Sequence, residues 1–324
     1  MLPYHFDGGT RVAKTAFLFP GQGSQTPGMA TALAQESQQA RDILAEIDST
    51  LGVHLSKLMA DGPADELQLT QNAQPALFAS SLATLKTIEG LTGRSIDQLC
   101  DFVAGHSLGE YSALCAAQTF EVASTASLLR LRGEAMQKAV PVGEGAMAAL
   151  LGADVELADA VIEAASANGL VEIANDNAAG QIVVSGETKA VEAAMQIARD
   201  KGLRRVLPLP VSAPFHCAMM APAADVMAQA LGSTTMRNAA VPVVCNITAA
   251  SEQSADKLRA NLIAQVTGRV RWRETMDYMV AEGITRFIEL GTGKVLSGLA
   301  KRAAPDAEIL SVDTLDDIKK AFDL

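Results

Sequence analysis

Residues 102–109, Phe102-Val103-Ala104-Gly105-His106-Ser107-Leu108-Gly109, decide the fold, because an apolar run ends in a turn that carries one serine. Glycine on each side of this Gly-x-Ser-x-Gly turn lets the backbone bend tightly and leaves room for a substrate. Apolar residues follow at near-helical spacing, at Tyr111, Leu114 and Cys115. The stretch therefore predicts a buried strand, a sharp turn and a helix, with Ser107 as a candidate nucleophile at the helix N-terminus.

A serine nucleophile needs a base, and histidine is the usual one because its unperturbed pKa lies near neutral pH. Of four histidines, His5 lies in an N-terminal leader and His54 follows a turn far from other signals. The side chain of His106 should point away from that of its neighbour Ser107. Elimination leaves His216, for which a structural, hydrogen-bonded histidine is the alternative. No carboxylate between the serine and His216 has an elbow-like setting, which favours a dyad whose imidazole is oriented by another acceptor, such as a backbone carbonyl.

The order of strands and helices indicates an α/β fold. A first strand at residues 15–19 runs into the glycine-rich loop 20–25, where α/β folds present backbone amides to ligands. Residues 29–87 have a helical pattern, with a turn at 61–63 and a break near Gln74-Pro75. Residues 1–14 form a loose leader in which disorder would be unsurprising.

The periodicity changes between residues 145 and 210. Strands are predicted at residues 146–151, 171–175, 181–185 and 204–209, and helices at 155–167 and 188–201. This βαββαβ order is that of a ferredoxin-like unit, inserted as a second domain. We expect a large domain made of residues 15–140 and 211–324 and a small domain made of residues 141–210. Further elements of the large domain are expected at residues 241–245, 255–266, 273–281 and 286–290.

Composition excludes several classes of protein. The 26 basic and 37 acidic residues give a net charge of −11, which argues against nucleic-acid binding. Apolar runs fall short of a membrane span and the N-terminus lacks a signal-peptide layout, so a soluble cytoplasmic protein is expected. The four cysteines have no Cys-x-x-Cys spacing, so neither a disulfide framework nor a metal site is predicted.

Several motifs together resemble one enzyme family. They are Pro-Gly-Gln-Gly-Ser-Gln at residues 20–25, Gly-His-Ser-Leu-Gly-Glu-Tyr-Ser at 105–112, Arg-Gly with Met-Gln at 132–137, Pro-Phe-His at 214–216 and Gly-x-Gly-Lys at 291–294. In this order and spacing, from about residue 15 to 302, the chain resembles the malonyl-CoA:acyl carrier protein transacylases of type II fatty acid synthesis. The resemblance implies an α/β-hydrolase-like large domain with a parallel sheet, a ferredoxin-like small domain, and a site in the cleft between them.

The resemblance also implies an activity. A malonyl group would pass from malonyl-CoA to the phosphopantetheine thiol of acyl carrier protein in a ping-pong reaction through a malonyl-serine ester, supplying fatty acid biosynthesis. Ser107 matches the nucleophile and His216 the base, while the backbone amides of Gln22 and Leu108 match the oxyanion hole. Arg132 matches the arginine that binds the malonyl carboxylate, although its helical setting alone would suggest a solvated surface charge.

Further positions match supporting residues of the family. Gln265 matches the residue whose backbone carbonyl orients the histidine, and Asn177, in a turn-like stretch, matches an asparagine near the acyl pocket. Phe215 should narrow the pocket against branched acyl groups, which favours malonyl over methylmalonyl. Thr292 replaces a frequent proline of the family. No cofactor or metal is implied, because the coenzyme A thioester is itself a substrate.

An acidic carrier protein needs a basic surface on this acidic chain. Candidates are Lys201, Arg204, Arg205, Arg269, Arg271, Arg273, Lys301 and Arg302. The enzyme is expected to be a monomer that binds malonyl-CoA and acyl carrier protein, and neither nucleic acid nor membrane. Two alternatives remain open: a serine esterase or acyl-thioester hydrolase with water as acceptor, and a non-catalytic carrier-binding scaffold or a subunit of a malonate-processing complex.

Overall fold

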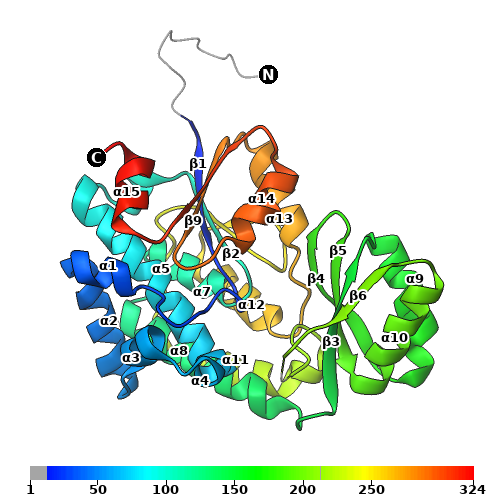
Figure 1. Ribbon diagram of the computed structural model, residues 1–324. Coiled ribbons are helices and arrows are strands. Elements are labelled where there is room, and N and C mark those ends of the chain that lie inside the picture. The colour runs from blue at the N-terminus through cyan, green and yellow to red at the C-terminus, as the bar shows by residue number, and fades with distance from the viewer. Residues whose placement is uncertain (1–12, 212) are drawn as a thin grey trace.

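A computed structural model describes residues 13–211 and 213–324 of the chain (Figure 1). Two β-sheets organise this part of the chain, and each sheet carries its own helices (Figure 1). Most of the predicted leader, residues 1–12, lies outside the described residues. The carbonyl of Lys14 accepts hydrogen bonds from the amides of Thr285 and Arg286, at 3.0 and 3.1 Å, which fixes the start of the first strand.

The larger sheet has the strand order β10-β9-β1-β2-β7-β8 and is parallel except for the last pair. Its strands are β1 (Thr15–Phe19), β2 (Phe102–Gly105), β7 (Val243–Val244), β8 (Ser251–Glu252), β9 (Arg286–Leu290) and β10 (Glu308–Val312). The strands predicted at residues 15–19 and 286–290 are confirmed, whereas the one predicted at 241–245 is shorter. Because parallel strands end at the same edge, the loops after β1, β2 and β7 meet there.

Helices cover both faces of this sheet, which explains why β1 is buried throughout and apolar from Ala16 to Phe19. Phe17 and Phe19 point into the core on one face, and Ala16 and Leu18 into the core on the other. The apolar core on the first face includes residues of α1 (Thr31–Glu36), α2 (Gln38–Leu51), α3 (Leu55–Asp61), α4 (Ala64–Gln68), α5 (Thr70–Thr92), α6 (Ile96–Leu99), α7 (Gly109–Ala116), α8 (Val122–Ala139), α11 (Ala221–Ser233), α12 (Ala255–Gln265) and α15 (Leu315–Phe322). The second face packs against α13 (Trp272–Ala281) and α14 (Val295–Ala303). No helix in the described ranges is long and apolar enough to cross a membrane.

The helical region before the elbow differs from the prediction at one point. The turn expected at residues 61–63 is confirmed, since α3 ends at Asp61 and α4 begins at Ala64. The break expected near Gln74-Pro75 is wrong, because α5 continues through Pro75. Most of α5 is buried in the core, and this packing outweighs the backbone hydrogen bond that proline removes.

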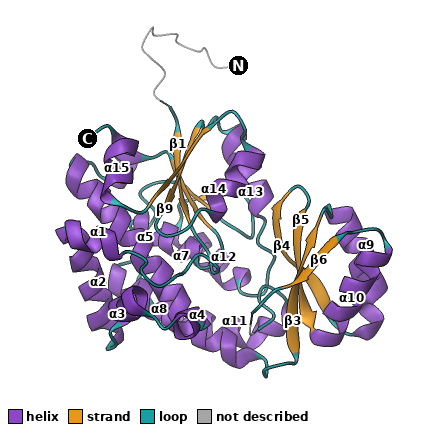
Figure 2. Ribbon diagram, viewed as in Figure 1, coloured by secondary structure: helices purple, strands orange, loops and turns teal. Residues whose placement is uncertain are grey.

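The smaller sheet is antiparallel, with the strand order β4-β5-β3-β6. Its elements follow in the predicted order: β3 (Gly145–Leu151), α9 (Val155–Ala165), β4 (Val171–Ala178), β5 (Gln181–Glu187), α10 (Thr188–Asp200) and β6 (Arg205–Pro208). Both helices lie on one face of this sheet (Figure 2) and form a separate apolar core with it. The other face is therefore free to form a wall of the site described below.

Strand β4 fastens the smaller sheet to the larger part of the molecule. The amide of Asp176 donates to the carbonyl of Val270 at 2.9 Å, and the amide of Val270 donates to the carbonyl of Ala174 at 2.8 Å. Beside them, the buried carboxylate of Asp176 forms an ion pair of 2.9 Å with Arg273 on α13. These contacts hold β4 against the segment that precedes α13.

Candidate active site

Ser107 occupies the turn between β2 and α7, in a backbone conformation that non-glycine residues rarely adopt (φ 54°). The glycines of the turn are required by close packing. A Cβ on Gly105 would lie 1.8 Å from the carbonyl oxygen of Gly109, and one on Gly109 would lie 2.2 Å from that of Phe19. The turn is therefore a strained strand-to-helix elbow that projects the serine at the carboxyl edge of the larger sheet.

His216 forms a hydrogen bond with the serine. Its Nε2 lies 2.7 Å from Oγ of Ser107, and its Nδ1 lies 2.9 Å from the backbone carbonyl oxygen of Gln265. A carbonyl oxygen can only accept, so Nδ1 carries the proton and the lone pair of Nε2 faces the hydroxyl. The pair can therefore pass the hydroxyl proton to the imidazole.

The surroundings of His216 keep its ring neutral in the empty site. Burial, and then the charge of Arg132, lower the pKa of His216 to about 3. Gln265 is the last residue of α12, and its carbonyl accepts from the imidazole. This negative end of the helix dipole favours an imidazolium when one forms during a reaction.

Arg132 lies beside the serine and is only 1% exposed. Its Nη1 donates to Oε1 of Gln74 at 2.9 Å, and its Nη2 donates to Oε1 of Gln265 at 3.0 Å and to Oγ of Ser107 at 3.2 Å. The guanidinium also lies 5.6 Å from the ring centroid of Tyr111. Within the described ranges no carboxylate forms an ion pair with it. A buried cation that contacts only neutral groups is a binding site for an anion.

A buried polar network supports the elbow from below, and sequence reasoning missed two of its members. Oδ1 of Asn246 accepts from the amide of Ser107 at 2.7 Å, and Nδ2 donates to the carbonyl of Gly105 at 2.7 Å. The amide of Asn246 and Nε2 of Gln265 both donate to Oε2 of Glu110, at 2.9 and 2.8 Å. Nε2 of Gln265 also donates to the carbonyl of Ser107 at 3.0 Å. Both backbone groups of the serine are thereby fixed.

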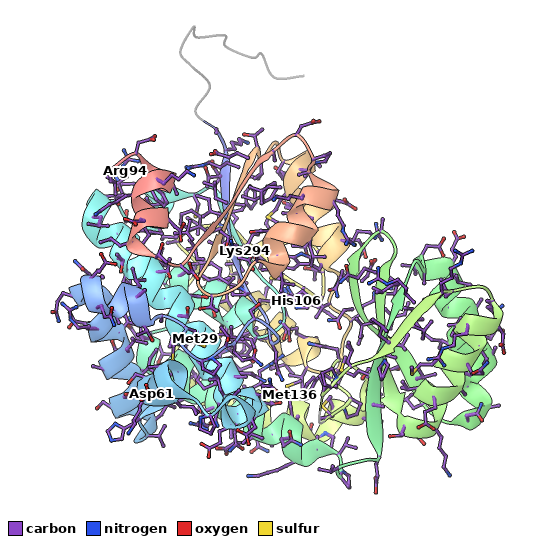
Figure 3. All side chains as sticks on the ribbon, viewed as in Figure 1. Met29, Asp61, Arg94, His106, Met136 and Lys294 are labelled. Carbon is purple, nitrogen blue, oxygen red and sulfur yellow. The ribbon has the colours of Figure 1, made fainter. Side chains whose placement is uncertain are left out.

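A cavity of about 380 Å³ opens over the serine. Residues of the larger part, among them Gln22, Leu108 and Arg132, line it together with Met147 and Asn175 of the smaller sheet. His106 and Met136, which also line it, lie on the side of the larger part that faces the smaller sheet (Figure 3). The volume is in the range of pockets that hold small-molecule ligands.

Two backbone amides at this cavity are free to bind an oxygen. The N–H groups of Gln22 and Leu108 have no acceptor in the part of the chain that the structure describes. Both residues line the cavity beside Ser107. Two such donors are the means by which acyl-transfer enzymes stabilise an oxyanion.

Asn177 lies within β4 and not in a turn, so that part of the prediction is wrong. The strand continues to Ala178, with an irregular register after Asp176. The side chain of Asn177 contacts Nε2 of His106 at 2.8 Å, and its neighbour Asn175, rather than Asn177, lines the cavity. The ring of His106 thus contacts the smaller sheet, and the imidazole that contacts Oγ of Ser107 is that of His216.

Three arginines of the predicted basic surface are already paired. Arg269 and Arg271 both form ion pairs with Glu274, and Arg273 pairs with Asp176. The members without an ion pair among the described residues are Lys201, Arg204, Arg205, Lys301 and Arg302. Of the predicted basic surface, only these five side chains thus carry a positive charge without an ion-pair partner among the described residues.

A serine and a histidine joined at a strand-to-helix elbow, beside two free backbone amides, are the equipment of an acyl-transfer enzyme. Residues 16–315 match the family described as the acyl transferase domain. The chain belongs to this family, as the resemblance predicted.

Relatives of known name are similar over nearly their whole length. The malonyl CoA-acyl carrier protein transacylase of Bacillus subtilis is 44% identical over 314 residues, which are 96% of this chain and 97% of that protein. The protein of the same name from Escherichia coli K12 is 42% identical, over 89% of this chain and 92% of its own.

Solved structures have the same fold. The acyl-carrier-protein S-malonyltransferase of Bartonella henselae has a TM-score of 0.94 and 49% identity, over 96% of this chain and 98% of its own. A malonyl-transacylase in complex with a type II PKS acyl-carrier protein has a TM-score of 0.90 and 39% identity, over 96% of this chain and 99% of its own. The mixed α/β fold with a mostly parallel and an antiparallel sheet is therefore that of the family.

Proposed function

We propose that this chain transfers the malonyl group of malonyl-CoA to the thiol of acyl carrier protein, through a malonyl ester of Ser107. The observation that carries the proposal is the buried guanidinium of Arg132, which forms no ion pair among the described residues and lies 3.2 Å from the serine Oγ. An acyl group on Ser107 would bring a carboxylate one carbon beyond its carbonyl next to that guanidinium. A short diacid supplies the missing charge, and an acetyl group does not.

The first half-reaction forms the ester. Nε2 of His216 takes the proton of Ser107 as Oγ attacks the thioester carbonyl, and the amides of Gln22 and Leu108 stabilise the resulting oxyanion. The carbonyl re-forms, the bond to sulfur breaks, and the imidazolium returns its proton to the coenzyme A thiolate. The second half-reaction is the reverse, with the carrier protein's thiol giving its proton to His216 and attacking the malonyl ester.

The substrate itself assists the base. The positive charge of Arg132 is one of the causes that lower the pKa of His216. A carboxylate bound to Arg132 would offset this charge and raise the pKa of the imidazole. The proton affinity of His216 would thus increase when an acid-bearing acyl group is in place.

We also propose the domain assignment that the resemblance implies. An α/β-hydrolase-like domain would comprise residues 15–140 and 211–324, and a ferredoxin-like domain residues 141–210. The strand order β4-β5-β3-β6, with α9 and α10 on one face, supports the second assignment. The serine elbow at the carboxyl edge of a mostly parallel sheet supports the first.

For the carrier protein we propose docking at the unpaired cations. Two of them, Arg205 and Arg302, line one groove of about 480 Å³. Arg205 belongs to β6 of the smaller sheet and Arg302 to α14 beside the larger sheet. Arg302 donates to Oε1 of Gln181 at 3.0 Å, which holds its side chain across the groove. This positive groove suits an acidic partner on a chain that is otherwise acidic.

Labelled malonyl-CoA, incubated with and without holo-carrier protein, tests the reaction. Label on the carrier and on intact enzyme supports the proposal, while free malonate alone would indicate the hydrolase alternative. Ser107→Ala should abolish enzyme labelling, and a chelator should leave the rate unchanged because the scheme uses no metal. If neither the enzyme nor the carrier protein is labelled and no malonate is released, the result would favour a non-catalytic, carrier-binding scaffold.

A further inference from the structure

Glu110 is a fully buried carboxylate that the reaction scheme above does not use. It follows Ser107 by three residues, in the first turn of α7. Its Oε2 accepts hydrogen bonds from the amide of Asn246 and from Nε2 of Gln265, whereas its Oε1 is buried and has no hydrogen-bond partner in residues 13–211 and 213–324. Burial of a carboxylate with one oxygen unsatisfied costs free energy, and such groups are often functional when they lie this close to the reacting atoms.

The side-chain amide of Gln265 connects Glu110 to Arg132. Nη2 of Arg132 donates to Oε1 of this amide at 3.0 Å, and Nε2 of the amide donates to Glu110 at 2.8 Å. A flipped amide would place its N–H groups against the guanidinium and its oxygen against the carboxylate. The two buried charges therefore fix the orientation of Gln265, whose backbone carbonyl holds His216.

The charges near Glu110 balance only in the empty site. The titratable groups that influence it are Arg132 on α8, Tyr111 on its own helix, and Cys245 after β7. Burial raises the pKa values of Tyr111 and Cys245, so both are uncharged at neutral pH. Among these groups only the guanidinium is charged, and it can compensate one carboxylate. A malonyl carboxylate would be the second.

We propose that Glu110 is the counter-charge of Arg132 in the empty site and takes up a proton from solvent when the malonyl carboxylate binds. This inference rests on the proposed function. The proton leaves a buffer acid and bonds to Oε1, the oxygen that has no donor, so that one guanidinium and one carboxylate remain charged. Burial, opposed by Asn246, Gln265, Cys245 and Arg132, already raises the pKa of Glu110 to about 7. Glu110 is thus a positioning residue that acts through Gln265 and Arg132.

Isothermal titration calorimetry measures this proton uptake directly. Malonyl-CoA is titrated into Ser107→Ala enzyme, which cannot form the ester, in two buffers with different ionisation enthalpies at about pH 7.5. With a pKa of about 7, roughly three quarters of Glu110 is ionised there, so uptake of about 0.7 proton is expected. Acetyl-CoA, which lacks the carboxylate, should bind without proton uptake.

Two double variants decide whether Glu110 is the acceptor. Ser107→Ala/Glu110→Gln keeps the shape without the charge and should bind malonyl-CoA with uptake near zero. Ser107→Ala/Glu110→Asp keeps the acid and should retain most of the uptake, which separates the titration from a merely structural effect. Thermal unfolding of each variant shows that it is folded.

The inference is overturned if malonyl-CoA binds Ser107→Ala enzyme without proton uptake, or if the Gln variant takes up as much as its parent. Failure of the proposed function appears separately, as unmodified enzyme that transfers no malonyl group to holo-carrier protein. In the active background, Glu110→Gln should also remove the dependence on the ionisation of this carboxylate from the pH profile of kcat/KM for malonyl-CoA.

Discussion

Replacing Arg132 by alanine should abolish malonyl selectivity while leaving the acyl-transfer machinery in place. The side chain is buried and held by Gln74 and Gln265, and it reaches within 3.2 Å of the serine Oγ. In the variant, a malonyl carboxylate would enter the same pocket without a cation to meet it. An acetyl group makes no demand on the guanidinium.

The size of the effect follows from the burial of this pair. Leaving one member of a buried ion pair without its partner costs about 3 to 5 kcal/mol. At about 1.4 kcal/mol for each factor of ten, kcat/KM for malonyl-CoA should fall by roughly two to three and a half powers of ten. Activity with acetyl-CoA should persist or rise, because the charge that opposes protonation of His216 is also removed.

The assay measures kcat/KM for both thioesters with the same holo-carrier protein. Arg130→Ala is the matched control, because Arg130 lies on the same helix, is half-buried and bonds Asn72 instead of the site. It should change neither value more than a few-fold. A similar loss for malonyl-CoA and acetyl-CoA in Arg132→Ala would refute the assigned role and would point to general damage of the elbow.

Three other predictions can be checked with the same protein. Asn246→Ala removes the partners of two buried backbone groups at the elbow. It should lower the free energy of unfolding by about 1 to 3 kcal/mol for each group, measured by thermal unfolding. It should also slow formation of the acyl-enzyme, measured by rapid quench. Glu110→Gln should gain stability relative to the parent as the pH rises from 5 to 8. Burial raises the pKa of Glu110 from 4.5 to about 7 in the folded state, so above pH 7 ionisation destabilises the parent's folded state by up to about 3 kcal/mol. A difference in Tm between variant and parent that stays constant with pH would contradict this. The double variant Arg204→Glu/Arg205→Glu should raise KM for carrier protein about tenfold and leave KM for malonyl-CoA unchanged. A KM for carrier protein equal to that of the parent would argue against docking at these arginines.

The sequence was sufficient for the elbow and its histidine because both have local signals. The Gly-x-Ser-x-Gly pattern predicts its own backbone, and elimination among few histidines selects His216. The position of Arg132 required the resemblance, since helical spacing alone does not distinguish a buried arginine from a solvated one. The βαββαβ order was predictable because period-two and helical patterns alternate clearly there.

The supporting network was not predicted, because it depends on strand pairing and not on local pattern. Asn246 follows a strand of only two residues, and its place under the elbow comes from the parallel pairing of β7 with β2. A rule was available: the first polar residue after the apolar run 241–245 should lie beside the loop that follows a neighbouring strand. Likewise, the ion pair of Arg273 with Asp176 arises from tertiary packing, whereas Glu274, which pairs with Arg269 and Arg271, is a near neighbour of both in the sequence.

The group that orients His216 is a main-chain carbonyl at the end of α12, so the orientation does not depend on which side chain stands at that position. Exchanging the side chain at position 265 leaves that carbonyl in place, so a substitution that keeps the helix terminus where it is cannot delete the acceptor. Only an insertion, a deletion or a proline that displaces the helix terminus would remove the acceptor. The orienting function is thereby protected against point mutation in a way that an aspartate in the same role would not be.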